Sequence, residues 1–485
     1  MKICDIIKRE DYLLCDIDEN TEFKRLVTSA SDATSEDILI ISNPDRSPDF
    51  SLAKSMPLAV ICGANILLPE NIPAIRVYNP RRMASYAFYR YEDPHLENIK
   101  IIAVTGTNGK TSTATMIENI LNKSGYKTGF IGSGKITVGG KRITDESYSM
   151  TTPDPDLLYH SLRLMSNEGC NAVIMEASSH ALALDKLAPL KIDVGVFTNL
   201  SPEHTDFHID MEGYFASKQK LFDVCDRAII NIDDDYGRRI FNDFEKKKTS
   251  VGILWRGDTW ATNIQNRGYD GMEYIYHGKD FSFKMNLPLP GSYNVYNSML
   301  AAAVCIELGY KPCRVKEILS KQNIIEGRFE IIKDDISVII DYAHTSEAFR
   351  SIIKELYALK GKGRLTVVFG CGGNRDRSKR PVMAQIAEKY ADRVIVTSDN
   401  TRNDDLKEII SDIIRGFEKG NYDIREDRAY AITDAITNAA KGDIVAIIGK
   451  GAEKYNIDKK GYRRFDEKEI ISSALLKRKE KNTCE

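Results

Sequence analysis

The stretch KIIAVTGTNGKTSTATMIENIL, residues 100–121, decides the fold of this chain. Its first part, Lys100–Val104, is an apolar run that predicts a buried strand, and a helical pattern continues to about Leu121. Between them lies the glycine-rich loop Thr105–Ser112. A strand, a glycine-rich loop and a helix in this order are the context that a phosphate-binding loop requires. We therefore expect a nucleotide-phosphate site in an α/β domain.

The residues of this loop suit a nucleotide with bound Mg²⁺. Glycine has no Cβ, so backbone N–H groups can approach phosphate oxygens, while Lys110 supplies a positive charge and Thr111 a hydroxyl for the metal. The general pattern places glycine at position 104, where this chain has Val104. The alternative is a glycine-rich turn with a surface lysine, which the flanking strand and helix disfavour. We assign these residues to ATP binding: Gly106, Thr107, Asn108, Gly109, Lys110, Thr111 and Ser112.

A metal held by Thr111 and ATP phosphates needs further oxygen or imidazole ligands. Glu176 ends a predicted strand at 172–176, and His204 and Asp206 follow a predicted strand at 194–199. Either segment alone could equally be a helix-capping turn. Together, at the ends of two strands, they favour a metal site.

The chain has 485 residues, enough for roughly three domains. Residues 1–96 predict a small α/β domain with short strands separated by helices, followed by a polar linker at Tyr91–Asn98. Residues 97–326 predict a doubly wound parallel sheet, with a further strand at 227–231 and an antiparallel excursion at 263–284. Residues 327–485 predict a third α/β unit. The expected fold class is thus α/β, with a P-loop ATPase-like central sheet and a Rossmann-like C-terminal unit.

In the third unit, each polar cluster follows a predicted strand. Ligands of open α/β sheets bind at the carboxyl ends of the strands, so these loops should line one cleft. The strands are expected at 337–341, 364–369, 393–397 and 443–448, and the loops at 341–345, 370–380, 398–403 and 449–453. Helices are expected near 346–359, 380–390 and 404–417.

Composition excludes several classes of protein. Lys plus Arg number 68 against 70 Asp plus Glu, so the net charge of −2 argues against a general binder of nucleic acid or membrane surfaces. Nine cysteines without a C-x-x-C pair indicate neither a disulfide framework nor a zinc site. An acidic N-terminus and the lack of a long apolar run predict neither a signal peptide nor a membrane span. We expect a cytoplasmic monomer.

An ordered set of motifs over almost the whole chain resembles the Mur ligases, ATP-dependent amide-forming enzymes of peptidoglycan precursor synthesis, and among them the MurE type, which adds the third amino acid. The motifs are VTGTNGKTST (104–113), TTPDP (151–155), MEASSHAL (175–182), FTNLSPEHTDFH (197–208), GSYNVYNSMLAAA (291–303), GRFE (327–330), DYAHTSEA (341–348), VFGCGGNRDRSKRPVM (368–383), SDNTRND (398–404) and GKGAEKY (449–455). The resemblance implies a domain for the UDP-sugar, a central ATPase domain and a Rossmann-like domain that closes over the site.

The resemblance also implies the reaction. ATP phosphorylates the carboxylate of UDP-MurNAc-L-Ala-D-Glu, and an amino-acid amine attacks the acyl phosphate. Charge on the phosphoryl and carbonyl oxygens would be stabilised by Lys110, by Mg²⁺ and by an arginine brought in on closure. Glu176 and His204 would be Mg²⁺ ligands. Lys218 matches a lysine that the family carbamylates, which makes it an anionic ligand, whereas the alternative is a surface helix lysine.

Further contacts follow from matching positions. Asn294 and Asn297 would lie near the adenine, and Arg328 and Asp341 would contact the nucleotide on closure, with His344 orienting that loop. The UDP-sugar peptide would be bound by Thr151, Thr152, Ser178 and Lys186.

The acceptor motifs favour a diamino acid. Family members that use meso-diaminopimelate carry D-N-P-R, whose arginine forks onto the distal carboxylate, and this chain has Arg402 in D-N-T-R. Their G-K-G-H-E motif reads G-K-G-A-E here and keeps Glu453 for the distal ammonium. Diaminopimelate therefore leads over lysine. The expected acceptor residues are Arg375, Asp399, Asn400, Thr401, Arg402, Gly449 and Glu453.

Departures from the family pattern keep alternatives open. They are Lys186 for an arginine, 28–32 (TSASD) for a D-S-R run that helps hold the uridine nucleotide, Thr401 for proline and Ala452 for histidine. A paralogue with the same ATP chemistry and another amine or carboxylate, including L-lysine, is one alternative. A folylpolyglutamate synthetase is disfavoured by the DNTR and GCGGNRD motifs. A silent scaffold is disfavoured by the retained residues Lys110, Thr111, Glu176, His204 and Lys218.

Overall fold

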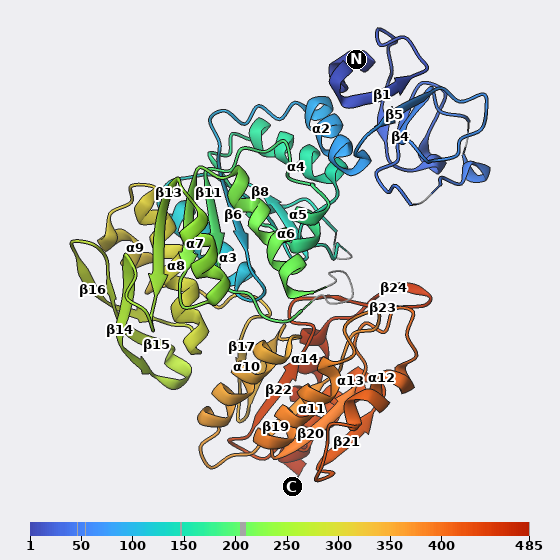
Figure 1. Ribbon diagram of the computed structural model, residues 1–485. Coiled ribbons are helices and arrows are strands. Elements are labelled where there is room, and N and C mark those ends of the chain that lie inside the picture. Colours follow the sequence, from blue (N-terminus) through green and yellow to red (C-terminus); the bar gives the residue numbers. More distant parts are fainter. Residues whose placement is uncertain (46, 54, 146–147, 204–209, 485) are drawn as a thin grey trace.

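The described residues form three large β-sheets, of five, eleven and six strands, and a small two-stranded sheet (Figure 1). The computed structural model describes all residues except 46, 54, 146–147, 204–209 and 485. The central unit lies between the other two, and the N-terminal unit stands off beyond α2 and α4 (Figure 1). The expected α/β fold is confirmed.

The N-terminal sheet has five strands in the order β1 (Tyr12–Cys15), β5 (Ala74–Val77), β4 (Ala59–Gly63), β3 (Ile38–Ile40) and β2 (Leu26–Val27). All neighbours are parallel except β1 and β5. The expectation of helices between these strands is wrong. The described links between these strands contain 3₁₀ turns, η2 (Ala30–Asp32) and η3 (Phe50–Leu52), and the four-residue helix α1 (Ile3–Ile6) precedes β1. Pro44 and Pro48 disfavour a helix between β3 and β4.

Helix α2 (Pro80–Glu92) connects this unit to the central one. Its Tyr89 packs edge-on against Tyr159 of α4 (Pro155–Asn167), with the ring centroids 5.6 Å apart. The helix ends where Asp93 adopts a left-handed conformation before Pro94. The linker was predicted at Tyr91–Asn98, which starts two residues too early, because Tyr91 and Glu92 still belong to the helix.

The central sheet has eleven strands, and β6 (Lys100–Thr105) lies between β11 (Val194–Phe197) and β10 (Ala172–Glu176). From β14 to β7 the neighbouring strands are parallel, whereas β14, β15 and β16 pair antiparallel, as the excursion at 263–284 predicted. The other strands are β7 (Thr128–Gly132), β8 (Lys135–Val138), β9 (Lys141–Arg142), β12 (Arg227–Asn231), β13 (Lys247–Gly252), β14 (Thr259–Asn266), β15 (Met272–His277) and β16 (Ser282–Leu287).

Helices cover both faces of this sheet. They are α3 (Lys110–Lys123), α4, α5 (Ser179–Ala183), α6 (Met211–Val224), α7 (Asp235–Asp243), α8 (Ser292–Glu307) and α9 (Pro312–Leu319). One buried cluster, which includes Phe197, Leu221 and Tyr159, continues into the core of the N-terminal unit. A second cluster packs α3 and α8 on the other face. The two clusters fix β6 and its loop from both sides.

The C-terminal sheet has the order β17 (Glu330–Lys333), β18 (Ser337–Asp341), β22 (Ile444–Ile448), β19 (Leu365–Phe369), β20 (Arg393–Thr397) and β21 (Tyr422–Arg425). Its neighbours are parallel except β17 and β18. Its helices are α10 (Ser346–Leu359), α11 (Lys379–Tyr390), α12 (Leu406–Ile414), α13 (Arg428–Thr437) and α14 (Glu467–Cys484). Helix α12 is shorter than the predicted 404–417 because the Asp405 side chain caps its start at Lys407 N and the chain leaves the helix at Arg415.

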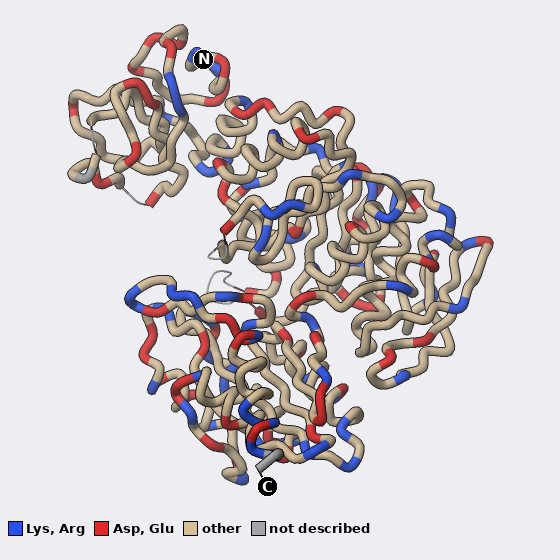
Figure 2. Tube along the Cα trace, turned by 180° about the vertical axis from the view of Figure 1, so that it is seen from behind, with Lys and Arg blue, Asp and Glu red and all other residues tan. Residues whose placement is uncertain are grey.

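A hairpin of β23 (Tyr455–Asp458) and β24 (Gly461–Arg464) projects from the C-terminal unit toward the central unit (Figure 1). Acidic and basic residues are interspersed along the chain in all three units (Figure 2), in keeping with the small net charge. Among the described helices, none is long and apolar enough to cross a membrane.

Candidate active site between the central and C-terminal units

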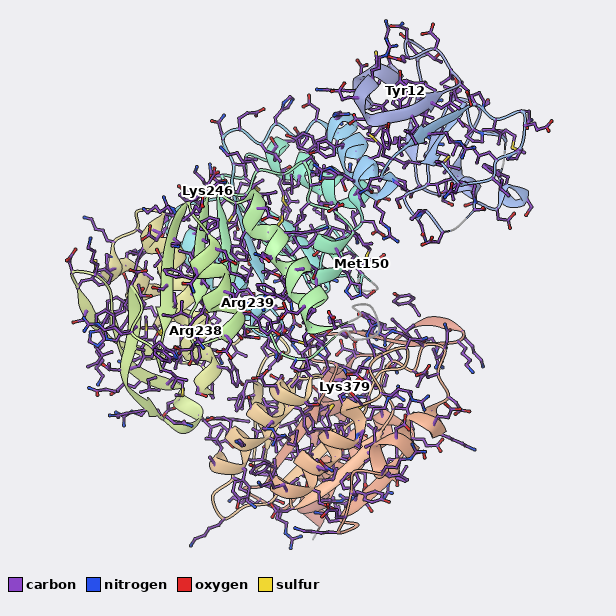
Figure 3. The ribbon with its side chains drawn as sticks, viewed as in Figure 1. Tyr12, Met150, Arg238, Arg239, Lys246 and Lys379 are labelled. Carbon is purple, nitrogen blue, oxygen red and sulfur yellow. The ribbon has the colours of Figure 1, made fainter. Side chains whose placement is uncertain are left out.

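A cavity of about 860 Å³ lies between the central and C-terminal units. Loops that follow β6, β10, β11 and β12 line it from the central unit, and loops that follow β18, β19, β20 and β22 line it from the C-terminal unit. Met150 and Lys379, labelled in Figure 3, line it from the two units. The prediction that the strand-end loops of the third unit share one cleft is confirmed. No described residue of the N-terminal sheet lines the cavity, so residues 28–32 lie away from it.

The phosphate loop depends on two glycines. Gly106 and Gly109 have φ angles of +143° and +86°. A Cβ on Gly106 would lie 1.9 Å from Thr198 Oγ1, and one on Gly109 would lie 2.4 Å from Asn297 Oδ1. The loop therefore exposes backbone N–H groups at the start of α3, where the helix dipole favours an anion. Val104 is fully buried inside β6, so the loop begins after it.

Lys110 is folded back over its own loop. Its Nζ donates to Gly106 O at 3.0 Å and to Thr107 O at 2.8 Å. Burial lowers the pKa of Lys110, while the charges of Glu203 and Glu176 oppose that shift. Lys110 Nζ therefore lies over two carbonyl oxygens of the loop whose N–H groups are predicted to bind phosphate.

Thr111 and Glu176 meet at the base of the cavity. The Thr111 hydroxyl lies 3.0 Å from each oxygen of Glu176, whose side chain is fully buried. The Ser133 backbone N and hydroxyl also donate to this carboxylate, at 2.9 and 3.2 Å. Sequence reasoning missed Ser133, although it follows strand β7 directly and the strand-end rule would have found it.

Lys218 lies inside the protein, so the alternative of a surface helix lysine is wrong. The residue lies on α6 and is 1% exposed. Its Nζ donates to Gly106 O at 2.9 Å and lies 4.6 Å from the centre of the Tyr214 ring. Burial, and then the charge of Lys110, hold the pKa of Lys218 well below its usual value. A neutral amine is the form that reacts with CO₂, so this environment suits carbamate formation.

The remaining predicted metal ligand, His204, and its neighbour Asp206 lie outside the described residues. Within the described part of the chain, no group of three or more His, Cys, Asp or Glu side chains is arranged to hold a metal ion. Thr111 and Glu176 are therefore the predicted ligands that the structure brings into contact.

The two asparagines predicted to lie near the adenine, Asn294 and Asn297, differ in their distance from the cavity. Asn297 lines the cavity, whereas Asn294 lies behind it, donates to Pro290 O at 2.6 Å and accepts from Asn297 Nδ2 at 3.1 Å. Asn294 thus orients Asn297 and does not reach the cavity itself.

Arg328 and Asp341 bring the C-terminal unit to the phosphate loop. Arg328 donates to Thr111 Oγ1 at 3.0 Å and stacks over the Tyr342 ring. Asp341 accepts from Phe329 N and Ala343 N, both at 2.7 Å, and so ties the hinge to the first loop of the C-terminal unit. Burial raises the pKa of Asp341, and the charge of Arg328 opposes that shift.

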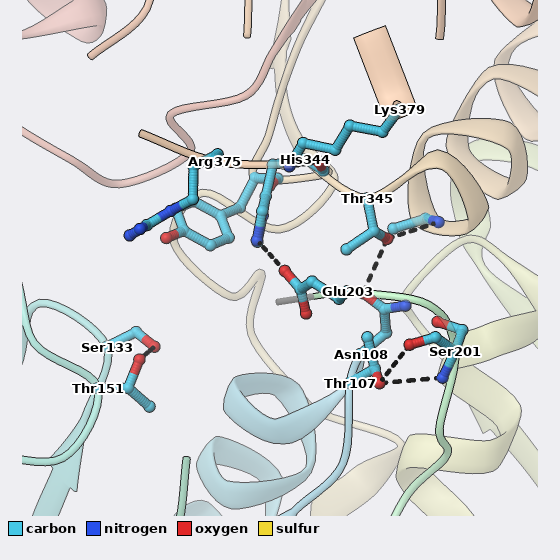
Figure 4. A network of polar contacts seen from close by, with 12 residues as sticks. Thr107, Asn108, Ser133, Thr151, Ser201, Glu203, His344, Thr345, Arg375 and Lys379 are labelled. Atoms are coloured by element: carbon cyan, nitrogen blue, oxygen red, sulfur yellow. Dashed lines mark hydrogen bonds and ion pairs between the residues drawn. The ribbon is translucent and has the colours of Figure 1, made fainter. Parts of the chain in front are cut away.

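Other contacts join the two units directly (Figure 4). His344 Nε2 lies 2.7 Å from Glu203 Oε1, and Thr345 Oγ1 lies 3.4 Å from Asn108 Oδ1. Lys379 donates to His344 O at 2.7 Å. His344 therefore does more than orient its loop. Its contact with Glu203 was not predicted, because the two residues lie 141 positions apart in the chain.

All the residues predicted to hold the UDP-sugar peptide line the cavity. Thr152 donates to Glu176 O at 2.7 Å and accepts from Ser178 N at 3.1 Å. Lys186 pairs with Asp154 at 2.7 Å. These contacts place the predicted peptide site next to the Thr111 and Glu176 pair.

All the predicted acceptor residues except Thr401 line the cavity. Arg402 has φ +49° and donates from one guanidinium nitrogen to Gly373 O at 3.0 Å and Asn400 O at 3.3 Å. Its own backbone N donates to Ile457 O at 3.0 Å. Strand β23 thus contacts the backbone of the D-N-T-R loop directly.

Comparison with known proteins gives a consistent result over the whole chain. Residues 104–305 match the Mur ligase middle domain, and residues 327–451 match the Mur ligase, glutamate ligase domain. The chain is 37% identical to the UDP-N-acetylmuramoyl-L-alanyl-D-glutamate--2,6-diaminopimelate ligase of Clostridioides difficile, covering 98% of this chain and 100% of that protein. It is 38% identical to the corresponding ligase 1 of Clostridium acetobutylicum, covering 86% and 88%.

A solved structure of a UDP-N-acetylmuramoyl-L-alanyl-D-glutamate--2,6-diaminopimelate ligase superposes with a TM-score of 0.66 at 26% identity, covering 98% of both chains. The similarity therefore includes the N-terminal unit, although that unit lies apart from the cavity.

Proposed function

The chain belongs to the Mur ligase family, to its MurE type, and from this membership we propose that it joins 2,6-diaminopimelate to UDP-MurNAc-L-Ala-D-Glu with hydrolysis of ATP to ADP and phosphate. One observation carries the proposal. A single cavity is lined by the predicted phosphate loop, by the buried side chains of Glu176 and Lys218, and by the predicted acceptor residues Arg402 and Glu453. The reacting carboxylate, the γ-phosphoryl group and the amine can therefore meet inside it.

The first step transfers the γ-phosphoryl group of ATP to the dipeptide carboxylate. A bond forms between a carboxylate oxygen and phosphorus, and the bond from phosphorus to the ADP oxygen breaks. Negative charge spreads over the phosphoryl oxygens, and the loop N–H groups, Lys110 and Arg328 supply fixed positive charge at that place. Arg328 comes from the C-terminal unit, so closure of the two units completes the set.

The Thr111 and Glu176 pair fits Mg²⁺. Both side chains present hard oxygen atoms, and the buried Glu176 carboxylate is held by the neutral groups of Thr111 and Ser133. We propose that these two residues, with His204 and carbamylated Lys218, hold the metal, which neutralises phosphate charge when bound. The low pKa of Lys218 supports the carbamate, since a buried ammonium would repel the cation.

The second step forms the amide. The amine nitrogen attacks the acyl carbonyl carbon, inorganic phosphate leaves with the bonding electrons, and the nitrogen loses a proton. We propose that Arg402 binds the distal carboxylate of the diamino acid and that Glu453 receives its distal ammonium. Both residues line the cavity from the C-terminal unit, and Thr152 and Ser178 line it from the central unit.

Phosphate release by the purified protein tests the proposal. The reaction contains ATP, Mg²⁺ and UDP-MurNAc-L-Ala-D-Glu with meso-diaminopimelate, L-lysine, L-ornithine or no amine. Release that depends on meso-diaminopimelate is the expected result. Release that depends equally on L-lysine would contradict the choice of amine, and no release with any amine would contradict the choice of carboxylate substrate.

A further inference from the structure

Lys450 is a buried cation that the proposed reaction does not use. Its side chain is 0% exposed, and it lies behind the wall of the cavity without lining it. Its Nζ lies 2.9 Å from Asn400 Oδ1, 3.5 Å from Glu453 Oε2 and 3.9 Å from Asp399 Oδ1. A lysine loses its hydration on burial, and two carboxylates and an amide oxygen compensate here.

Two glycines allow Lys450 to enter this position. Gly449 has φ +125°, and a Cβ there would lie 2.7 Å from Asp399 Oδ2. Gly451 has φ +55°, and its Cβ would lie 2.7 Å from Gly327 O. The G-K-G run therefore turns tightly and directs the lysine side chain inward, under the acceptor loop.

Lys450 fixes the orientation of the Asn400 amide. Asn400 Oδ1 accepts from Lys450 Nζ and also from Ile457 N at 3.0 Å. Two donors at one atom define that atom as the oxygen, so the amide NH₂ must point the other way. Asn400 Nδ2 accordingly donates to Glu453 Oε2 at 2.8 Å.

Glu453 is thus held by both Asn400 and Lys450. Oε2 accepts from Asn400 Nδ2 and faces Lys450, and the residue lines the cavity on its other side. A carboxylate fixed before binding loses less side-chain entropy when it takes up an ammonium group.

We propose that Lys450 is a positioning residue for the diamino acid. It aligns Glu453 through Asn400 so that this carboxylate meets the distal ammonium of the acceptor, an inference that rests on the proposed function. Lys450 itself does not touch the substrate. The expected effect of losing it is confined to acceptors that carry the distal ammonium.

The test compares two acceptors and two variants. 2-Aminopimelate has the two carboxylates and the reacting amine of diaminopimelate but lacks the distal amine. The variants are Lys450→Met and, as a matched control, Lys460→Met, whose lysine is exposed in the turn between β23 and β24. KM and kcat are measured by phosphate release, and 2-aminopimelate is measured as a competitive inhibitor if it does not turn over.

Lys450→Met should raise KM for meso-diaminopimelate about tenfold, because the charge pair between Glu453 and the distal ammonium loses its alignment. The KM or inhibition constant of 2-aminopimelate should change by less than about twofold. Lys460→Met should leave both unchanged. An equal rise for both acceptors would assign Lys450 a general structural role and overturn the proposal, as would an unchanged KM for meso-diaminopimelate.

A second variant keeps the test decisive if Lys450→Met does not fold, as judged by its melting transition. Asn400→Leu removes the relay but leaves Lys450 beside Glu453 and Asp399. The same selective rise in KM supports the proposal, and an equal or absent effect overturns it. If the unaltered protein shows no release that depends on diaminopimelate, the proposed function fails independently of either variant.

Discussion

At the scale of single residues, Lys110 should be essential for turnover. It is the lysine of the phosphate loop, and its Nζ already lies over Gly106 O and Thr107 O. Lys110→Ala removes a positive charge from the position where phosphoryl charge develops, so we expect kcat to fall by about a hundredfold to a thousandfold. Phosphate release measures the effect. Near-normal turnover would contradict the assignment of the ATP site.

Lys218 gives a prediction about chemical rescue. If its carbamate is an oxygen ligand, Lys218→Ala should lose activity and regain part of it when formate or acetate is added, because a small carboxylate can occupy the space of the carbamate. Lys220→Ala is the matched control, since Lys220 is exposed on the same helix. It should stay active and not respond to carboxylates. Absence of rescue in Lys218→Ala would count against the carbamate.

Arg402 should discriminate between acceptors. L-Lysine has no distal carboxylate, so Arg402→Ala should raise KM for meso-diaminopimelate much more than KM for L-lysine. Arg415, which is largely exposed at the end of α12, provides the control Arg415→Ala. Amide formation is followed with both amines. An equal effect of Arg402→Ala on the two amines would reject a role at the distal carboxylate.

At the scale of elements, helix α14 should depend on one buried ion pair. Arg428 of α13 and Glu467 of α14 lie 2.6 Å apart with side chains 1% and 2% exposed, and Arg428 also donates to Ile448 O at the end of β22. Glu467→Gln leaves the arginine charge without its partner, so we expect a loss of about 3 kcal/mol and a Tm several degrees lower.

The control for this pair lies on the same helix. Glu469 pairs with Arg464 at the surface, and both side chains are more than half exposed. Exposed pairs contribute less than about 1 kcal/mol, so Glu469→Gln should leave Tm almost unchanged. Equal Tm values for the two variants would show that the buried pair contributes no more to stability than the exposed pair.

Helices and strands were the features that the sequence predicted best. The predicted strand at 100–104 and the helical pattern that follows it correspond to β6 and α3. Both predictions succeeded because apolar runs and helical periodicity depend on residues close together in the chain. The N-terminal links were mispredicted because short apolar runs separated by turn residues do not distinguish a short helix from a 3₁₀ turn. Strand β7 was also missed, and with it Ser133, the residue that completes the Glu176 contacts.

At the scale of the whole molecule, contacts between Glu203 and His344, Asn108 and Thr345, and Thr111 and Arg328 hold the central and C-terminal units together. His344→Ala removes the shortest of these contacts. We therefore expect the ligand-free variant to open, with a larger radius of gyration by small-angle X-ray scattering and a higher KM for ATP. His95→Ala, at an exposed site in the N-terminal part, is the control. An unchanged scattering profile would contradict a role for His344 in closure.

The sequence by itself determined the class of fold and the order of strand, glycine-rich loop and helix at residues 100–121. These depend on residues close together in the chain, where backbone preferences and side-chain periodicity act. Tertiary structure decided which of those residues reach the cavity. Asn294, Thr401 and Lys450 lie in motifs whose neighbours line it, yet none of the three does. It also decided the partnerships of His344 with Glu203 and of Lys450 with Asn400, since strand order and the packing of two units bring together residues that are distant in sequence.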